Sequence, residues 1–248
     1  MSQTLDRALS ILDVLAERPR RINDVAEHLG VHHSTALRLL HTLRSHGFVK
    51  ELPDHSYRLG PATFQLAFTA LEGLKLRSVA RPYMEKLNAQ TGETIHLGTL
   101  EDDDVVYIEK VEARHRVRMH SSIGAIATLH CTGVSKAVLA FLPEAERERL
   151  IGSHTLNRFT DRTLCTVAEL KADLATARER GYAIDDEEHE PGIRCIAAPI
   201  VGADGDVVGA ISLTAPLSRI DRDSLEGFAA ALLEATQGAS RELGWPGA

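Results

Sequence analysis

Polar and basic side chains recur at helical spacing between residues 34 and 44, where they could contact DNA. Arg38 lies near the middle of this stretch, and a guanidinium group can bind guanine through two hydrogen bonds. Hydroxyl and basic groups can bind phosphates or base edges. The candidate DNA-binding residues are Ser34, Thr35, Arg38, His41, Thr42 and Arg44, with Lys50 and Arg58 as further phosphate contacts.

The apolar pattern around these residues predicts the elements that would hold them. Leucines, isoleucine and alanines spaced by three and four predict a helix over Thr4–Ala16, then a short helix capped by Asn23 and ended by Gly30. A third helix begins at His33 or Ser34 and runs to Gly47. Two short strands follow, Phe48–Leu52 and Ser56–Leu59. Three helices and a hairpin form a winged helix-turn-helix, which inserts one helix into a major groove; a plain three-helix packing unit is the alternative.

A second group of residue types, His130, Asp185 and Cys195, could serve nucleophilic catalysis. There a base lowers the thiol pKa and a carboxylate orients the base. A metal site built from His96, His120, His130 and Cys131 is a further hypothesis. Neither set has a tight local spacing, and a cysteine on a strand is usually a small core residue. The alternative function is therefore a cytosolic enzyme or metal sensor with an appended helix-turn-helix.

The distal part of the chain alternates between helical and strand patterns. A helix from Pro61 would join the two parts. Further helices are predicted over Leu74–Gln90, over His130–Leu142, from the capping box Thr166/Glu169 to Arg180, and over Asp221–Leu243. Strands are predicted over Thr94–Leu100, Val105–Val111, Val117–Ser121, Tyr182–Asp185, Ile193–Val201 and Val207–Thr214. We expect a mixed sheet with helices at its two ends in sequence.

Charge is divided unevenly along the 248 residues, which carry a net charge of -7. Residues 1–62 hold 8 basic and 7 acidic residues, whereas the remainder holds 20 and 28. The slightly basic N-terminal quarter suits a polyanionic partner. No apolar run approaches a membrane span and no signal peptide is recognisable, so we expect a cytoplasmic protein with three reduced cysteines and no membrane partner.

Several motifs in order along the chain resemble the IclR family of bacterial transcriptional regulators. The first of them along the chain are Leu5–Leu12, Ser34–Leu43, Tyr57–Gly60 and, beyond the winged helix-turn-helix, Arg81–Pro82. In the distal part they are Thr91–Leu97, Leu129–Thr132, Lys136–Ala137, Arg180–Ala183, Gly192–Pro199 and Gly209–Ser212.

The resemblance implies an α+β protein in three parts. Residues 1–62 would form the winged helix-turn-helix, residues 63–78 a linker helix, and residues 79–248 a GAF-like mixed α/β effector-binding domain. Members of the family act as homodimers or dimers of dimers on double-stranded operator DNA, as repressors or activators. They are not enzymes, and no cofactor or metal is implied.

The resemblance also implies where an effector binds. The corresponding residues are Met119, Gly133, Val134, Asp185, Ile193, Cys195, Ser212 and Thr214. Backbone N–H groups at a helix start and the hydroxyls of Ser212 and Thr214 suit a carboxylate, so the expected effector is a small organic or aromatic acid. Thr128, Gly133 and Ser135 depart from the residues usual in the family beside this pocket.

Overall fold

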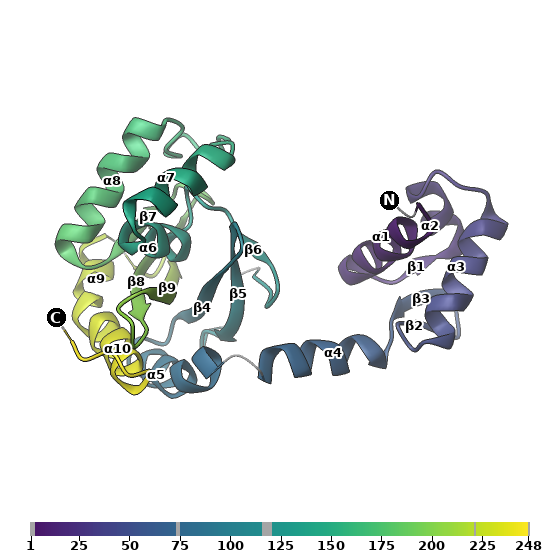
Figure 1. The fold of residues 1–248 in the computed structure, drawn as a ribbon, viewed down its shortest axis with the longest axis horizontal. Coiled ribbons are helices and arrows are strands. Elements are labelled where there is room, and N and C mark those ends of the chain that lie inside the picture. The colour runs from purple at the N-terminus through teal and green to yellow at the C-terminus, as the bar shows by residue number, and fades with distance from the viewer. Residues whose placement is uncertain (1–2, 73–74, 116–120, 221, 248) are drawn as a thin grey trace. The chain divides into compact units, whose positions relative to one another are not determined.

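The computed structural model describes residues 3–72, 75–115, 121–220 and 222–247 (Figure 1). The chain divides into two compact units, residues 1–73 and 74–248. Each unit has its own sheet and its own hydrophobic core. Every helix in the described ranges is too short or too polar to cross a membrane.

The N-terminal unit is a winged helix-turn-helix. Its elements are α1 (Gln3–Glu17), β1 (Arg20–Arg21), α2 (Ile22–His28), α3 (His33–Ser45), β2 (Val49–Glu51), β3 (Ser56–Leu59) and α4 (Pro61–Glu72). The strands form an antiparallel sheet in the order β1-β3-β2. The three helices, the hairpin and the helix at Pro61 confirm the predictions, whereas β1, with two residues, is too short to give a sequence pattern.

The apolar faces of α1, α2 and α3 meet in one core. Ile11, Val25, Ala36 and Leu40 are buried there. Gly30 adopts a φ of 61° between α2 and α3, a conformation that glycine reaches without steric cost.

The predicted cap of α2 is wrong. The N-cap residue is Arg21, and its backbone N–H donates to the Asp24 carboxylate at 3.0 Å. Asn23 is exposed within the first turn instead. The negative charge of Asp24 in the first turn also suits the positive end of the helix dipole.

The C-terminal unit contains a six-stranded sheet in the order β6-β5-β4-β9-β8-β7. Its elements are α5 (Lys75–Thr91), β4 (Thr94–Glu101), β5 (Asp104–Val111), β6 (Ile126–Ala127), α6 (Gly133–Phe141), α7 (Glu144–Ser153), α8 (Val167–Arg180), β7 (Ala183–Asp186), β8 (Ile193–Val201), β9 (Val207–Pro216), α9 (Arg222–Gly227) and α10 (Ala229–Glu242). All described strand pairs are antiparallel, so the expectation of a mixed sheet is wrong. The α+β fold itself is confirmed.

Helices cover both faces of this sheet (Figure 1). Ala210 on β9 belongs to the core cluster that α6 and α8 form against the sheet. Gly209, one residue earlier, faces α5, where an added Cβ would lie 2.9 Å from Leu76 Cδ2. Successive strand residues point to opposite faces, so α5 and α6 lie on opposite sides of β9.

Three predictions in this unit need correction. The helix expected from His130 begins at Gly133, because Thr132 is extended (φ −98°, ψ 141°). The helix α7 was not predicted, since its two buried residues, Leu150 and Ile151, are adjacent and give no helical period. The closing helix is divided into α9 and α10 after Gly227, a residue of low helix propensity. The strand expected over 117–121 lies almost wholly outside the described residues.

The capping box of α8 gives a stability prediction. The Thr166 hydroxyl accepts from the Glu169 backbone N–H at 3.2 Å, and the Glu169 carboxylate accepts from the Thr166 backbone N–H at 3.0 Å. Replacing Thr166→Ala removes this cap and should lower the free energy of unfolding by about 1 kcal/mol in urea titrations. Thr176→Ala, in the exposed middle of the same helix, should not destabilise the protein. Equal losses from both substitutions would contradict the capping role.

Candidate DNA-binding face and effector cavity

The helix α3 presents a polar stripe to solvent. Ser34, Arg38, His41 and Ser45 follow one another at intervals of four, three and four residues, so they lie on one face, and all four are exposed. Thr42 is exposed beside this stripe, and Thr35 is half-buried. The opposite face of α3 packs into the core of the unit, which fixes the direction in which the stripe points.

The first turn of α3 is held by a histidine. His32 is the N-cap, and its Nδ1 accepts from the Ser34 backbone N–H at 3.3 Å and lies 2.9 Å from the Ser34 hydroxyl. Histidine is not among the residues that typically cap helices, so no sequence pattern predicts this role. A capped first turn keeps the start of α3 ordered where it would meet phosphates.

Arg44 does not share the polar stripe. Its guanidinium is paired with the Glu51 carboxylate on β2, and His55 Nδ1 lies 3.2 Å from the same carboxylate. Arg44 therefore braces α3 against the wing. On the wing strands, Lys50 is exposed, whereas Arg58 is half-buried and donates to the Leu59 carbonyl at 2.8 Å.

A cavity of about 240 Å³ lies in the C-terminal unit between the sheet and the start of α6. Strands β4, β5, β7, β8 and β9 all contribute to its wall. The lining residues are His96, Tyr107, Ser121, Ser122, Ala125, Ile126, Thr132, Gly133, Asp185, His189, Glu190, Ile193, Cys195 and Thr214.

The structure brings most of the expected effector residues to this cavity. Five of them line it: Gly133, Asp185, Ile193, Cys195 and Thr214. Val134 and Ser212 are buried but are not among the lining residues. Met119 lies outside the described residues.

The start of α6 opens onto the cavity. Thr132, its N-cap, makes no side-chain cap bond, and Gly133 follows it at the wall. A Cβ on Gly133 would lie 2.7 Å from Cys195 Sγ, so the absence of a side chain lets the helix start approach β8. Backbone N–H groups at a helix start favour an anion.

A buried charge cluster lies behind the same wall. The fully buried Lys136 ammonium donates to the Glu188 carboxylate at 2.6 Å and to the Asp173 carboxylate at 2.9 Å. The Glu188 backbone N–H donates in turn to Asp185 at 2.8 Å. Burial and the neighbouring Glu188 charge raise the pKa of Asp185 to about 7.

The opposite wall carries a neutral histidine that the sequence suggested only as a metal ligand. His96 on β4 lies with its ring 5.1 Å from the Tyr107 ring, and its Nε2 is 2.7 Å from the Ser121 hydroxyl. Its other ring nitrogen, Nδ1, is buried and has no hydrogen-bond partner among the described residues. Burial lowers the pKa of His96 to about 3, so it acts at neutral pH as an uncharged hydrogen-bonding group.

The geometry does not form the nucleophilic site that His130, Asp185 and Cys195 could have built. Asp185 and Cys195 are paired across β7 and β8, but His130 Nε2 lies 2.9 Å from the Asn157 carbonyl and its ring contacts Phe159. Burial raises the pKa of the Cys195 thiol to about 12, whereas a nucleophile needs a lowered pKa.

The described residues also contain no group of three histidine, cysteine or acidic side chains placed to hold a metal ion. His120, one of the four residues in the metal hypothesis, lies outside the described residues. The other three therefore form no such group among themselves.

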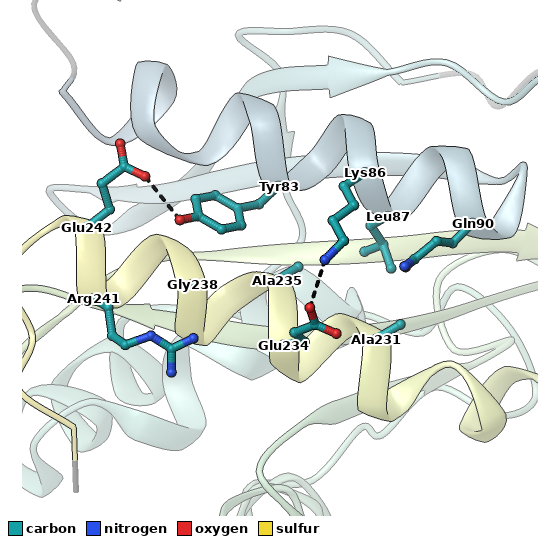
Figure 2. Close-up of a pocket in the computed structure, with 10 residues that line it drawn as sticks. All are labelled: Tyr83, Lys86, Leu87, Gln90, Ala231, Glu234, Ala235, Gly238, Arg241 and Glu242. Carbon is teal, nitrogen blue, oxygen red and sulfur yellow. Dashed lines mark hydrogen bonds and ion pairs between the residues drawn. The ribbon is translucent and has the colours of Figure 1, made fainter.

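A second hollow lies between α5 and α10 (Figure 2). Lys86 is paired with Glu234 at 2.7 Å, and the Tyr83 hydroxyl donates to Glu242 at 3.0 Å. These polar groups bind one another across the hollow, and Lys86 and Glu234 are largely exposed. None of the expected site residues lines it.

Comparison with known proteins gives consistent matches over nearly the whole chain. Residues 4–53 match the IclR helix-turn-helix domain, and residues 68–241 match the domain described as bacterial transcriptional regulator IclR C-terminal. The HTH-type transcriptional regulator XynR of Escherichia coli is 36% identical, covering 98% of each chain. The transcriptional repressor IclR of the same organism is 33% identical, covering 95% of this chain and 88% of the relative.

Solved structures give the same result. The Thermotoga maritima IclR structure superposes with a TM-score of 0.85 and 30% identity, covering 99% of this chain and 100% of that one. An IclR homologue from Microbacterium hydrocarbonoxydans, crystallised with 4-hydroxybenzoate, superposes with a TM-score of 0.80 and 26% identity, covering 97% and 98%.

The raised pKa of Asp185 predicts a pH dependence of stability. An unfolded aspartate loses its proton near pH 4, but folded Asp185 keeps it to about pH 7, so the folded state binds the proton more tightly. Its contribution to stability is complete below pH 4 and is lost as the pH rises through 7. In denaturant titrations, the free energy of unfolding should therefore change less between pH 4 and pH 8 for Asp185→Asn than for the unsubstituted protein. Glu101→Gln, at the exposed end of β4, should keep the original slope; identical profiles for all three proteins would refute the raised pKa.

Proposed function

The chain belongs to the IclR family of bacterial transcriptional regulators, and we propose that it binds operator DNA through α3 while a small organic or aromatic acid in the cavity changes that affinity. The observation that carries this proposal is that one chain combines an exposed polar stripe on α3 with a polar cavity in a separate compact unit. The relatives are transcriptional regulators, and no enzymatic role is proposed.

The DNA-binding role rests on the geometry of the winged helix-turn-helix. The second helix of a helix-turn-helix motif, here α3, enters the major groove. The stripe on α3 would therefore meet base edges, while the wing would reach the DNA backbone. Arg38 is exposed at the centre of the stripe and would read guanine. Ser34, Thr35, His41 and Thr42 would contact bases or phosphates, and Lys50, Arg44 and Arg58 would contribute positive charge from the wing side.

The effector role rests on the donors around the cavity. The start of α6 and the Thr214 hydroxyl can bind an oxyanion, while Ile193 and the Tyr107 ring offer apolar contact. The 4-hydroxybenzoate complex of the Microbacterium relative supports an aromatic acid as one candidate.

Exposed apolar side chains in the N-terminal unit suit a second copy of the chain. Leu5 and Leu9 lie one helical turn apart on α1 and are 60% and 54% exposed. Phe64 and Leu66 project from different sides of α4 and are also largely exposed. A helix with apolar side chains on different sides is normally covered by another part of the protein or by a partner. A second copy of the chain would also supply the second recognition helix that a symmetric operator needs. We therefore assign these residues to a homodimer contact.

The regulatory mechanism would be a shift between two arrangements of the dimer. An acid that binds one arrangement better favours that arrangement and so changes the spacing of the recognition helices. The shift in the equilibrium between the two arrangements cannot exceed the difference in the acid's affinity for them. In this scheme residues 1–62 bind DNA, residues 63–78 link the two parts and residues 79–248 bind the effector. The protein would act in the cytoplasm.

Operator recognition is tested at Arg38. Arg38→Ala should weaken binding to the operator by about 1–3 kcal/mol, because a guanine contact is lost. The difference between the affinity for the operator and the affinity for scrambled DNA should become smaller. Fluorescence anisotropy with DNA from upstream of the protein's own gene, or with sites chosen from random DNA, measures both affinities. Arg178→Ala, which removes an exposed charge from α8, should change neither. Unchanged discrimination in Arg38→Ala would contradict the assigned role.

A second prediction concerns the dimer. Leu9→Glu places a charge in the apolar contact and should shift the protein towards monomer in sedimentation experiments, with loss of operator affinity. Asp13→Asn, on an exposed position one turn further along α1, should remain dimeric. A Leu9→Glu protein that stays dimeric at micromolar concentration would remove α1 from the interface.

A further inference from the structure

The charges around the effector cavity do not suit a simple anion. Its described lining includes two carboxylates, Asp185 and Glu190, and neither lysine nor arginine. An acid bound beside ionised Asp185 would bring two negative charges together in a buried site, which is strongly unfavourable. An acid effector therefore needs a proton or a cation at this wall.

The buried ammonium behind the wall is already engaged. Lys136 contacts Glu188 and Asp173, and no direct contact joins it to Asp185. The titratable and charged groups around Asp185 and at the cavity wall are Lys136 on α6, Cys131 before it, Glu188, His189 and Glu190 after β7, Cys195 on β8, Tyr107 on β5 and His96 on β4. Burial lowers the pKa of His189 and raises those of both thiols and of Tyr107, which favours the neutral form of each near pH 7.

Among the residues that the structure describes, the balance of charge leaves one carboxyl group without a counterion. The Lys136 ammonium is the one described cation beside the carboxylates of Asp173, Glu188 and Asp185, and its two contacts go to the first two. Asp185 is 5% exposed, and its carboxyl group accepts hydrogen bonds from the backbone N–H groups of Glu188, at 2.8 Å, and His189, neither of which carries a charge. The pKa of about 7 agrees with this geometry, since the proton replaces the missing cation.

We propose that the cavity binds its acid effector together with one proton, which Asp185 holds and donates to the effector's carboxylate. The proton comes from solvent, and a hydrogen bond from Asp185 to the effector forms without any covalent change. The backbone N–H at the start of α6 and the Thr214 hydroxyl supply the other donors. This inference rests on the effector role proposed above, and it adds that the recognition uses a neutral carboxyl group in place of a cation.

A different role for Asp185 would give the opposite behaviour. An ionised Asp185 could accept a hydrogen bond from a hydroxyl of the effector. Binding would then tighten as the pH rises, because deprotonation creates the acceptor. The direction of the pH dependence thus separates the two roles.

The test is isothermal titration of the full-length protein with benzoate, 4-hydroxybenzoate and gluconate between pH 6 and pH 8.5, where all three acids stay ionised. For an acid that binds, the dissociation constant should rise about 30-fold across this range, since each pH unit above 7 costs about a factor of ten. Paired buffers of different ionisation enthalpy should show uptake of about one proton per acid at pH 8.5 and almost none at pH 6.

Variants separate the proton from other effects of pH. Asp185→Asn places a permanent donor at the same position, so it should bind the acid with an affinity that no longer depends on pH. Glu101→Gln removes an exposed carboxylate and should keep the full dependence. The pH series on the unsubstituted protein remains decisive if Asp185→Asn fails to fold.

The outcomes also separate this inference from the proposed function. Affinity that is constant with pH, affinity that rises with pH, or failure of all three acids to bind at pH 6 would each overturn the proton-coupled site. Operator binding, measured by anisotropy on the same preparations, tests the regulator role independently. Selective operator binding with any of those results would leave the DNA-binding role intact.

Discussion

The cavity in the C-terminal unit, the proposed effector site, depends on one buried charge and the partners that neutralise it. Lys136 lies on α6 without exposure to solvent, a position that costs several kcal/mol unless the ammonium is paired. Its contacts with Asp173 and Glu188 join α6, α8 and the segment after β7. That segment carries His189 and Glu190 to the cavity wall, and the Glu188 backbone orients Asp185. The packing of the helices and the polarity of the cavity therefore have a common origin.

The N-terminal unit shows the same dependence of function on packing, here through apolar contacts. The buried face of α3 is fixed against α1 and α2, so the exposed stripe can point in only one direction. The pair between Arg44 and Glu51 ties the helix to the wing, and His32 orders its first turn. In the proposed DNA-binding role, a surface held in this way would meet DNA already ordered, and the entropy cost of binding would be smaller.

Sequence patterns predicted the features that depend on neighbouring residues. The periodicity of α3, the capping box at Thr166 and the turn at Gly30 are local, and the structure has all three. Five of the residues that the family resemblance named line one cavity, but the resemblance did not indicate that His96 and Tyr107 also line it. Contacts between distant residues were not predictable. Lys136 meets partners 37 and 52 residues away, and Arg44 meets a glutamate on another element, so no short pattern reveals that these charges are paired.

The central claim is that occupation of the cavity and binding of the operator are coupled. The most direct test is a linkage experiment, in which operator affinity is measured with and without a saturating acid, and acid affinity with and without operator. We expect each ligand to change the affinity of the other by the same factor, about 5-fold to 150-fold for a typical coupling free energy of 1–3 kcal/mol. An acid that occupies the cavity while operator affinity stays unchanged would contradict it.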